Sequence, residues 1–167
     1  SALEKPLIAM IRGFCIGGGL AVALSADIRI AADDSVYAIP AARLGLGYGY
    51  QGVNRLVHLV GPAYAKEIFF TARKFTGEEA LRMGLINRLT TVADLEATTG
   101  EYAAMIAENA PLTIQTANMA VAAALADPAD RNLAAVDAMV DKCFASADYK
   151  EGQAAFMEKR KPAFRGL

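Results

Sequence analysis

Two kinds of hydrophobic pattern divide the chain. In the first half, short apolar runs stand between glycines or polar turns, which is typical of buried strands. Such runs cover residues 7–12, 28–32, 36–39 and 85–89, and a short apolar helix is predicted over 20–26. The order of strand, glycine turn, helix and strand indicates a layered α/β fold.

After Gln51 the apolar residues recur at the spacing of amphipathic helices. A first helix is predicted to end at Gly61, and Pro62 is expected to begin the next one. Thr76 and Glu79 have the spacing of a capping box, in which each side chain bonds to the backbone N–H group of the other residue. The middle of the chain is therefore predicted to be mainly helical, with defined helix ends.

The last third of the chain is rich in alanine and is predicted to form three or four helices. The predicted breaks are Ala110-Pro111, Asp127-Pro128 and residues 146–148. The change in composition near Val92 divides the chain into an α/β portion, residues 1–92, and a helical region, residues 93–167. Helices outside a core must bury their apolar faces, so this region is interpreted either as additional core or as an oligomerisation region.

Composition and charge exclude several classes of function. The 167 residues carry 17 Lys and Arg against 18 Asp and Glu, a net charge of −1, which provides no basic surface for nucleic acid or for a membrane. Two distant cysteines and a single histidine do not provide the ligand cluster of a structural zinc site, so no metal is expected. The longest apolar stretch, residues 13–26, is too short to span a bilayer, and no signal peptide precedes it; a soluble cytoplasmic protein is expected.

Three consecutive glycines, Gly17, Gly18 and Gly19, lie between a predicted strand and a predicted helix. Glycine permits positive φ angles and close approach of a ligand to the backbone, and a helix N-terminus presents free N–H groups. These features suit an anion or oxyanion site, whereas the spacing differs from that of dinucleotide and nucleotide phosphate loops. The alternative interpretation is a tight packing turn.

The glycine turn belongs to a longer pattern that resembles the crotonase family, also called the enoyl-CoA hydratase/isomerase family. The similar segments are 5–9 (KPLIA), 13–19 (GFCIGGG), 25–31 (SADIRIA), Leu44-Gly45, Arg55-Leu56, Gly61, Ala80, Gly84-Leu85 and 151–162 (EGQAAFMEKRKP). The resemblance covers nearly the whole chain. It implies a crotonase-like fold with a spiral core of ββα units and a C-terminal helical oligomerisation region.

The resemblance also implies a substrate and an oxyanion hole. Members bind an acyl-CoA thioester and hold its carbonyl oxygen between two backbone N–H groups, one of which corresponds to Gly18. The second N–H group would come from a loop before Ser1, so the chain is expected to represent the C-terminal two thirds of the family fold. The expected partners are the acyl-CoA substrate and further copies of the chain, as a trimer or a dimer of trimers. No cofactor is expected beyond the coenzyme A of the substrate.

Further site residues follow from the family pattern. The substrate pocket would include Ile16, Gly17, Ala21, Pro40, Ala41 and Leu44. Phe156 and Lys159 fall where the last helix of the family approaches the CoA adenine and its 3′-phosphate. The alternative for these two residues is an ordinary solvated helix end.

The chain departs from the pattern of the hydratases at two positions. The family hydratases carry glutamates where this chain has Ala21 and Ala41. Hydration requires groups that activate water and protonate the α-carbon, and alanine can do neither. Asp27, Asp33 and Asp34 are the nearby carboxylates, and they are interpreted as a structural residue and a solvated turn.

Tyr48 indicates a different reaction. The segment 44–48 (LGLGY), with Gly61, 66–68, 70–72 and 84–87, resembles the methylmalonyl-CoA decarboxylase branch, which has a tyrosine at this position. Decarboxylation of a malonyl-type thioester forms the same enolate and requires no base, and Tyr48 could orient the carboxylate or donate a proton. That branch keeps a carboxylate at the position of Ala21. Three hypotheses therefore remain: a decarboxylase, a hydratase or isomerase with another acid/base group, and a non-catalytic acyl-CoA-binding subunit.

Three other residues invite a functional interpretation. Arg43 could pair with an acyl carboxylate or with Asp34. Cys15 is interpreted as a packed small residue because no base lies near it in the sequence. His58 is interpreted as a half-buried helix residue.

Overall fold

The computed structural model describes residues 5–167 of the chain. Residues 7–101 form one compact unit and residues 102–167 belong to a second. The division falls inside helix α5 (Leu95–Ala107), whereas the change in composition near Val92 suggested a boundary at 92/93. Each unit is described by itself below.

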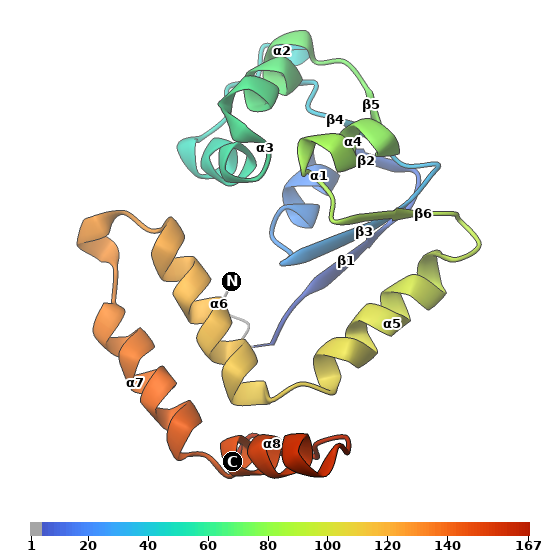
Figure 1. The fold of residues 1–167 in the computed structure, drawn as a ribbon. Helices are drawn as coiled ribbons and strands as arrows, with labels where there is room; N and C mark the ends of the chain where they lie inside the picture. Colours follow the sequence, from blue (N-terminus) through green and yellow to red (C-terminus); the bar gives the residue numbers. More distant parts are fainter. Residues whose placement is uncertain (1–4) are drawn as a thin grey trace. The chain divides into compact units, whose positions relative to one another are not determined.

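The first unit contains a parallel sheet whose strands are β1 (Ile8–Ile11), β3 (Ile28–Ala32) and β6 (Arg88–Thr90), in the order β1-β3-β6 (Figure 1). Ile8 of β1 lies opposite Ile28 of β3, and Ile30 lies opposite Arg88 of β6. Residues 30–32 are completely buried, as expected for the central strand of a parallel sheet. The strand predicted at 85–89 begins three residues later than expected.

A second small sheet has the order β2-β4-β5, with β2 (Phe14–Ile16) parallel to β4 (Val36–Ala38) and β5 (Phe75–Thr76) antiparallel to β4. The sequence pattern did not predict β2. Gly13 adopts a φ of 64° between β1 and β2, a conformation that glycine reaches without strain, and the chain passes there from one sheet to the other.

Helix α1 (Gly18–Ala23) follows β2 directly and is shorter and earlier than the predicted helix at 20–26. Helix α2 (Ala41–Leu44) follows β4 and ends at Gly45, which has a left-handed conformation. Leu20 of α1 is buried in the same apolar core as Tyr37 and Leu56. The core therefore fixes the glycine turn to the two strands on either side of it.

Helix α3 (Tyr50–Thr71) contains a kink at Gly61, where φ is 74° and ψ is 167°. The predicted end of one helix and start of the next at Gly61 and Pro62 is confirmed. The predicted capping box is also present: the Thr76 hydroxyl accepts the Glu79 N–H at 3.3 Å, and the Glu79 carboxylate accepts the Thr76 N–H at 2.8 Å. It begins helix α4 (Gly77–Met83), which ends at Gly84.

The second unit is helical. Its elements are the end of α5, α6 (Pro111–Leu125), a 3-10 turn (Pro128–Asp130), α7 (Leu133–Ala145) and α8 (Ala147–Glu158). These are the helices and breaks that the sequence predicted. Ser146 begins α8 with a side-chain cap, because its hydroxyl accepts the Tyr149 N–H at 3.0 Å.

Two carboxylates of α8 bind the residues that follow this helix. Asp148 is 4% exposed and accepts the N–H groups of Arg165 and Gly166, each at 2.8 Å. Glu151 pairs with Arg160 through two contacts of 2.6 and 2.9 Å. The C-terminal residues are therefore fixed against α8.

Candidate functional site

The glycine turn has the geometry of a backbone N–H site. Gly17 adopts φ 54° and ψ −113°, and its N–H donates to the Ala38 carbonyl at 2.9 Å. Its carbonyl accepts the Ala21 N–H at 3.0 Å, which closes the first turn of α1. The N–H groups at the start of a helix have no partner within that helix, and no atom lies within 4 Å of a Cβ placed on Gly18 or Gly19. Open space therefore adjoins the Cα atoms of these two glycines at the start of α1.

A pocket of about 240 Å³ lies beside this turn, within the first unit. It is lined by Gly17, Ala21, Leu24, Ile39, Tyr48, Gln51, Gly52 and Arg55. Four segments meet there: the glycine turn with α1, the end of β4, the loop before α3, and the first turns of α3. The structure thus brings three predicted site residues, Gly17, Ala21 and Tyr48, around one cavity.

Tyr48 lies two residues before α3 and is half-buried. Its ring packs edge-on against Phe69, with the ring centres 5.1 Å apart and the planes at 67°. Phe69 belongs to the part of α3 after the kink at Gly61, and in the part before it the Tyr48 ring lies 3.7 Å from a Cβ placed on Gly52. The packing holds the ring while part of it lines the pocket.

The charges around the pocket are unevenly distributed. No carboxylate is among the lining residues, and Arg55 is the charged residue of the set. Asp27 accepts the Leu7 N–H at 2.7 Å, and Asp34 accepts the Gly13 N–H at 3.2 Å and pairs with Arg12 at 3.5 Å. These aspartates hold the ends of β1, and neither they nor Asp33 reach the pocket.

The other predicted pocket residues lie around these segments without lining the cavity. Ile16 and Gly18 are direct neighbours of Gly17, and Pro40 precedes α2 as its N-terminal cap. Ala41 is only 5% exposed and packs in the apolar core, while Leu44 at the end of α2 is 72% exposed. Ala41 therefore does not line the pocket, although Ile39, which belongs to the same apolar core, does.

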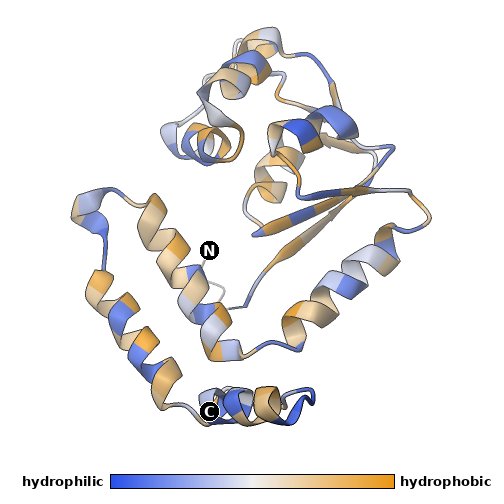
Figure 2. Cartoon of the chain, viewed as in Figure 1, coloured by the Kyte–Doolittle hydropathy of each residue, from blue (hydrophilic) through white to orange (hydrophobic). Residues whose placement is uncertain are grey.

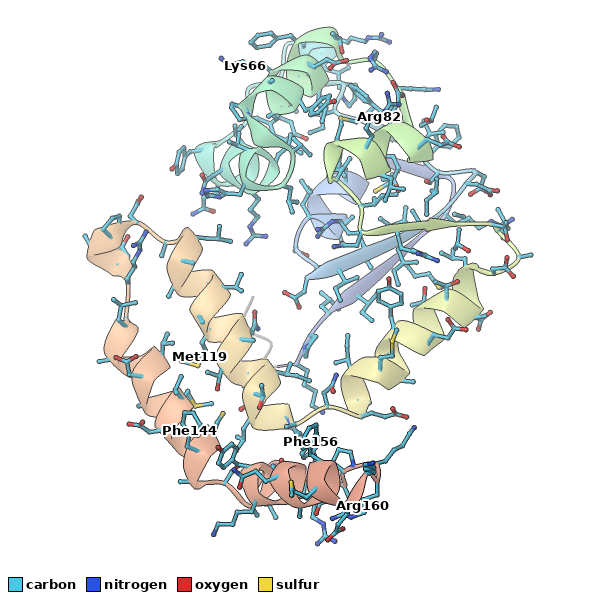
Figure 3. The ribbon with its side chains drawn as sticks, in the orientation of Figure 1. Lys66, Arg82, Met119, Phe144, Phe156 and Arg160 are labelled. Atoms are coloured by element: carbon cyan, nitrogen blue, oxygen red, sulfur yellow. The ribbon has the colours of Figure 1, made fainter. Side chains whose placement is uncertain are left out.

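Phe156 and Lys159 belong to the second unit. Phe156 lies on α8, with its side chain drawn in Figure 3, and lines a separate pocket of about 340 Å³. Tyr149 and Phe164 line the same pocket, so three of its lining residues are aromatic. Lys159 ends α8 in a left-handed conformation, with φ 53°.

Cys15 and His58 take no part in the site. Cys15 is 6% exposed and burial raises the pKa of its thiol to about 11, so the thiol stays protonated and unreactive near neutral pH. His58 is exposed on α3 rather than half-buried as the sequence suggested. Arg43 is exposed on α2, and Asp34 pairs with Arg12 instead of Arg43.

Within residues 5–167, no group of three or more His, Cys, Asp or Glu side chains could hold a metal ion. No helix in this range is both long enough and apolar enough to cross a membrane.

Sequence reasoning missed two polar residues of the pocket, Gln51 and Arg55. They lie four residues apart on α3 and therefore share one helix face. The signal was available, because the apolar positions Leu56 and Val60 define the opposite, buried face of the same helix. That polar face could be predicted to point away from the core, but not toward a particular cavity.

Comparison with known proteins places these features in a family. The family described as enoyl-CoA hydratase/isomerase matches residues 1–166. A short-chain-enoyl-CoA hydratase of Clostridium acetobutylicum is 39% identical over 159 residues, which is 95% of this chain and 61% of that protein. A crotonyl-CoA hydratase of Syntrophomonas wolfei is 36% identical, over 98% of this chain and 63% of its own length.

A solved structure is also similar. The enoyl-CoA hydratase of Bacillus anthracis superposes with a TM-score of 0.87 at 32% identity, covering 99% of this chain and 64% of that one. The chain thus spans less than two thirds of the length of the relatives that it matches.

Proposed function

Because the chain belongs to the enoyl-CoA hydratase/isomerase family, whose crotonase-like α/β fold it shares, we propose that it binds an acyl-CoA thioester and stabilises the enolate of that ester. Within this class we favour decarboxylation of a malonyl-type acyl-CoA. The observation that carries this choice is the composition of the pocket beside the glycine turn. Tyr48 lines it, and no carboxylate-bearing residue does.

In the proposed reaction the C–C bond to the carboxylate breaks and CO2 leaves. The electron pair of that bond moves into the thioester and forms an enolate, so the thioester carbonyl itself accepts the electrons and no additional cofactor is needed. The Gly18 N–H at the start of α1 would donate to the enolate oxygen. One such donor is typically worth about 3–4 kcal/mol of transition-state stabilisation.

The α-carbon of the enolate must then take up a proton. Tyr48 lines the pocket together with Ala21 and Gly17, and it is the lining residue that carries a side-chain O–H group. In this scheme Tyr48 donates the proton, or orients the departing carboxylate through a hydrogen bond, and is reprotonated from water. Its contact with Phe69 would keep the ring in one orientation.

The same reasoning bears on Ala21, which lines the pocket, whereas Ala41 is buried in the apolar core. The decarboxylase branch keeps a carboxylate at the position of Ala21; here such a group would line the pocket and add a negative charge beside an anionic acyl group. Alanine removes that charge, and it also removes the acid/base group that hydration would need.

Hydration is the second candidate function, because the two relatives named above are hydratases. It would require another acid/base group in place of the glutamates. The third candidate, an acyl-CoA-binding subunit without chemistry, fits the loss of both glutamates equally well. Product analysis separates the three.

The experiment is mass spectrometry of the products formed by the protein made from its native gene, with any residues before Ser1 retained. It is incubated in parallel with methylmalonyl-CoA, ethylmalonyl-CoA and crotonyl-CoA. Loss of CO2, about 44 Da, from the first two esters is the expected result, since it reports formation of the enolate. Gain of water, about 18 Da, on crotonyl-CoA would instead establish hydration by another acid/base group.

The matched variant is Tyr48→Phe, which removes the hydroxyl and keeps the ring that packs on Phe69. We expect kcat for decarboxylation to fall about 10²-fold or more, while binding of free CoA stays unchanged. Turnover that is unaffected in this variant would remove Tyr48 from the mechanism. If CoA binds and no thioester reacts, the binding-subunit hypothesis replaces the enzyme.

We also propose that coenzyme A contacts Phe156 and Lys159 and that the chain forms a homo-oligomer. Phe156 is 83% exposed on α8 and lines an aromatic pocket, which suits stacking of an adenine, and a lysine suits a phosphate. The exposed apolar side chains of the second unit support self-association and are discussed below.

A further inference from the structure

Arg55 combines three properties that the proposed reaction does not use. It lines the pocket, it is the charged residue among the lining side chains, and it forms no ion pair within residues 5–167. Three other arginines of the first unit have partners: Arg12 pairs with Asp34, Arg73 pairs with Glu67 and Glu79, and Arg29 donates to backbone carbonyls. The pocket therefore contains a positive charge with no internal partner.

The surroundings of Arg55 add to this positive character. Gln51 lies one helical turn earlier on the same face of α3 and lines the same pocket, so its amide N–H2 group can donate there. The first turn of α3 contains no acidic residue and has no side-chain cap. A neutral acyl chain would gain nothing from this arrangement, whereas an anionic one would gain charge-assisted hydrogen bonds.

We propose that Arg55 is the specificity residue that selects acyl thioesters carrying a second carboxylate on the acyl group. The inference rests on the proposed function, because it assigns the acyl end of a CoA thioester to this pocket. Arg55 binds the carboxylate from α3, and the glycine turn, which lines the same pocket through Gly17, would bind the thioester oxygen. It is a binding residue and takes no proton.

The proposed ion pair also predicts how loss of Arg55 affects KM and kcat separately. An ion pair with the carboxylate stabilises the bound substrate, but the carboxylate loses its charge as CO2 forms. Interactions that are stronger in the ground state than in the transition state lower KM without raising kcat. Loss of Arg55 should therefore raise KM for a malonyl-type ester while kcat stays the same or rises.

The test uses a pair of ligands that cannot react. S-(2-carboxypropyl)-CoA and S-propyl-CoA are thioethers that differ by one carboxylate, and neither has the carbonyl that decarboxylation needs. Their dissociation constants are measured by titration calorimetry on the protein made from its native gene. We expect the wild type to prefer the carboxylated ligand about tenfold or more.

The preference should disappear in Arg55→Gln and be partly kept in Arg55→Lys, which retains the charge without the planar guanidinium. Arg43→Gln is the matched control, because it removes one exposed arginine that does not line the pocket, and it should keep the full preference. Thermal unfolding of the three variants shows that the fold is intact, as expected for exposed side chains.

Two results would overturn the inference. A wild type that binds both thioethers equally has no carboxylate selectivity to explain. If Arg55→Gln weakens both ligands by the same factor, Arg55 contacts the coenzyme A phosphates instead. These results do not depend on turnover, so they stay separate from failure of the proposed decarboxylation, which the CO2-loss experiment reports.

Discussion

Individual side chains determine which chemistry the pocket can perform. Gly17 and Ala21 come from one turn, Tyr48 from the loop before α3, and Arg55 from α3 itself. In the proposed reaction, a glutamate at position 21 would place a negative charge beside the anionic acyl group. The side chain at position 21 can therefore be exchanged as a direct test, because Ala21 is exposed and leaves room for a longer side chain.

Ala21→Glu should lower kcat/KM for a malonyl-type ester by about ten- to a hundredfold relative to Ala21→Gln. The two side chains have nearly the same size, so the difference between the variants isolates the negative charge. Two like charges about 4 Å apart repel by roughly 1–4 kcal/mol in a partly solvated site. The measurement is steady-state kinetics of CO2 release at low salt. Equal kinetics of the Glu and Gln variants would show that the acyl carboxylate lies elsewhere.

At the scale of elements, the predictable features were those encoded by neighbouring residues. The kink at Gly61 and the capping box of Thr76 and Glu79 follow from local rules, and both are present. Strand β2 could not be predicted in this way. It has only three residues. It forms because Gly13 directs the chain out of the β1-β3-β6 sheet, so that Cys15 of β2 pairs with Tyr37 of β4 in the second sheet.

The candidate site could also be predicted only where local sequence patterns define it. The motif in the sequence predicted Gly17, Ala21 and Tyr48, and the structure places all three at one pocket. Gln51 and Arg55 were missed because periodicity predicts which helix face is polar and not what that face meets. Ala41 was expected to line the pocket, yet it is buried in the core, because where its side chain lies depends on tertiary packing.

The contact between Glu151 and Arg160 ties the end of α8 to the C-terminal residues. Two hydrogen bonds from Arg160 and one from the Ala163 N–H lower the pKa of Glu151 to about 2. A carboxylate whose pKa is lowered on folding stabilises the folded state fully above its unfolded pKa, which is near 4.5. That contribution is lost as the pH falls toward 2.

Glu151→Gln should therefore lower the Tm at pH 7, and the difference from the wild type should shrink as the pH is lowered from about 5 to 3. Glu101→Gln, an exposed position on α5, is the control and should leave Tm within the error at each pH. The measurement is thermal unfolding followed by circular dichroism. A Tm difference that does not change across this range would mean that Glu151 titrates normally in the folded protein.

At the scale of the whole molecule, the second unit exposes several large apolar side chains. Val121 and Leu125 on α6 are 59% and 54% exposed, and Leu133 on α7 is 58% exposed. Figure 2 shows α6 coloured as hydrophobic over most of its length. Val121 and Leu125 are four residues apart and share one face of the helix. Contiguous exposed apolar surface of this kind marks an interaction site.

A second copy of the chain is the partner we propose, since homo-oligomers are the commonest way to bury such a face. The double variant Val121→Asp with Leu125→Asp places two negative charges on this face of α6. If the face is an interface between copies, the variant should have a smaller mass than the wild type by light scattering, because uncompensated buried charges are strongly destabilising. Lys150→Glu, which also changes the net charge by two but replaces an exposed polar side chain on α8, should keep the wild-type mass. A monomeric wild type would refute self-association, and an unchanged mass of the double variant would place the interface away from α6.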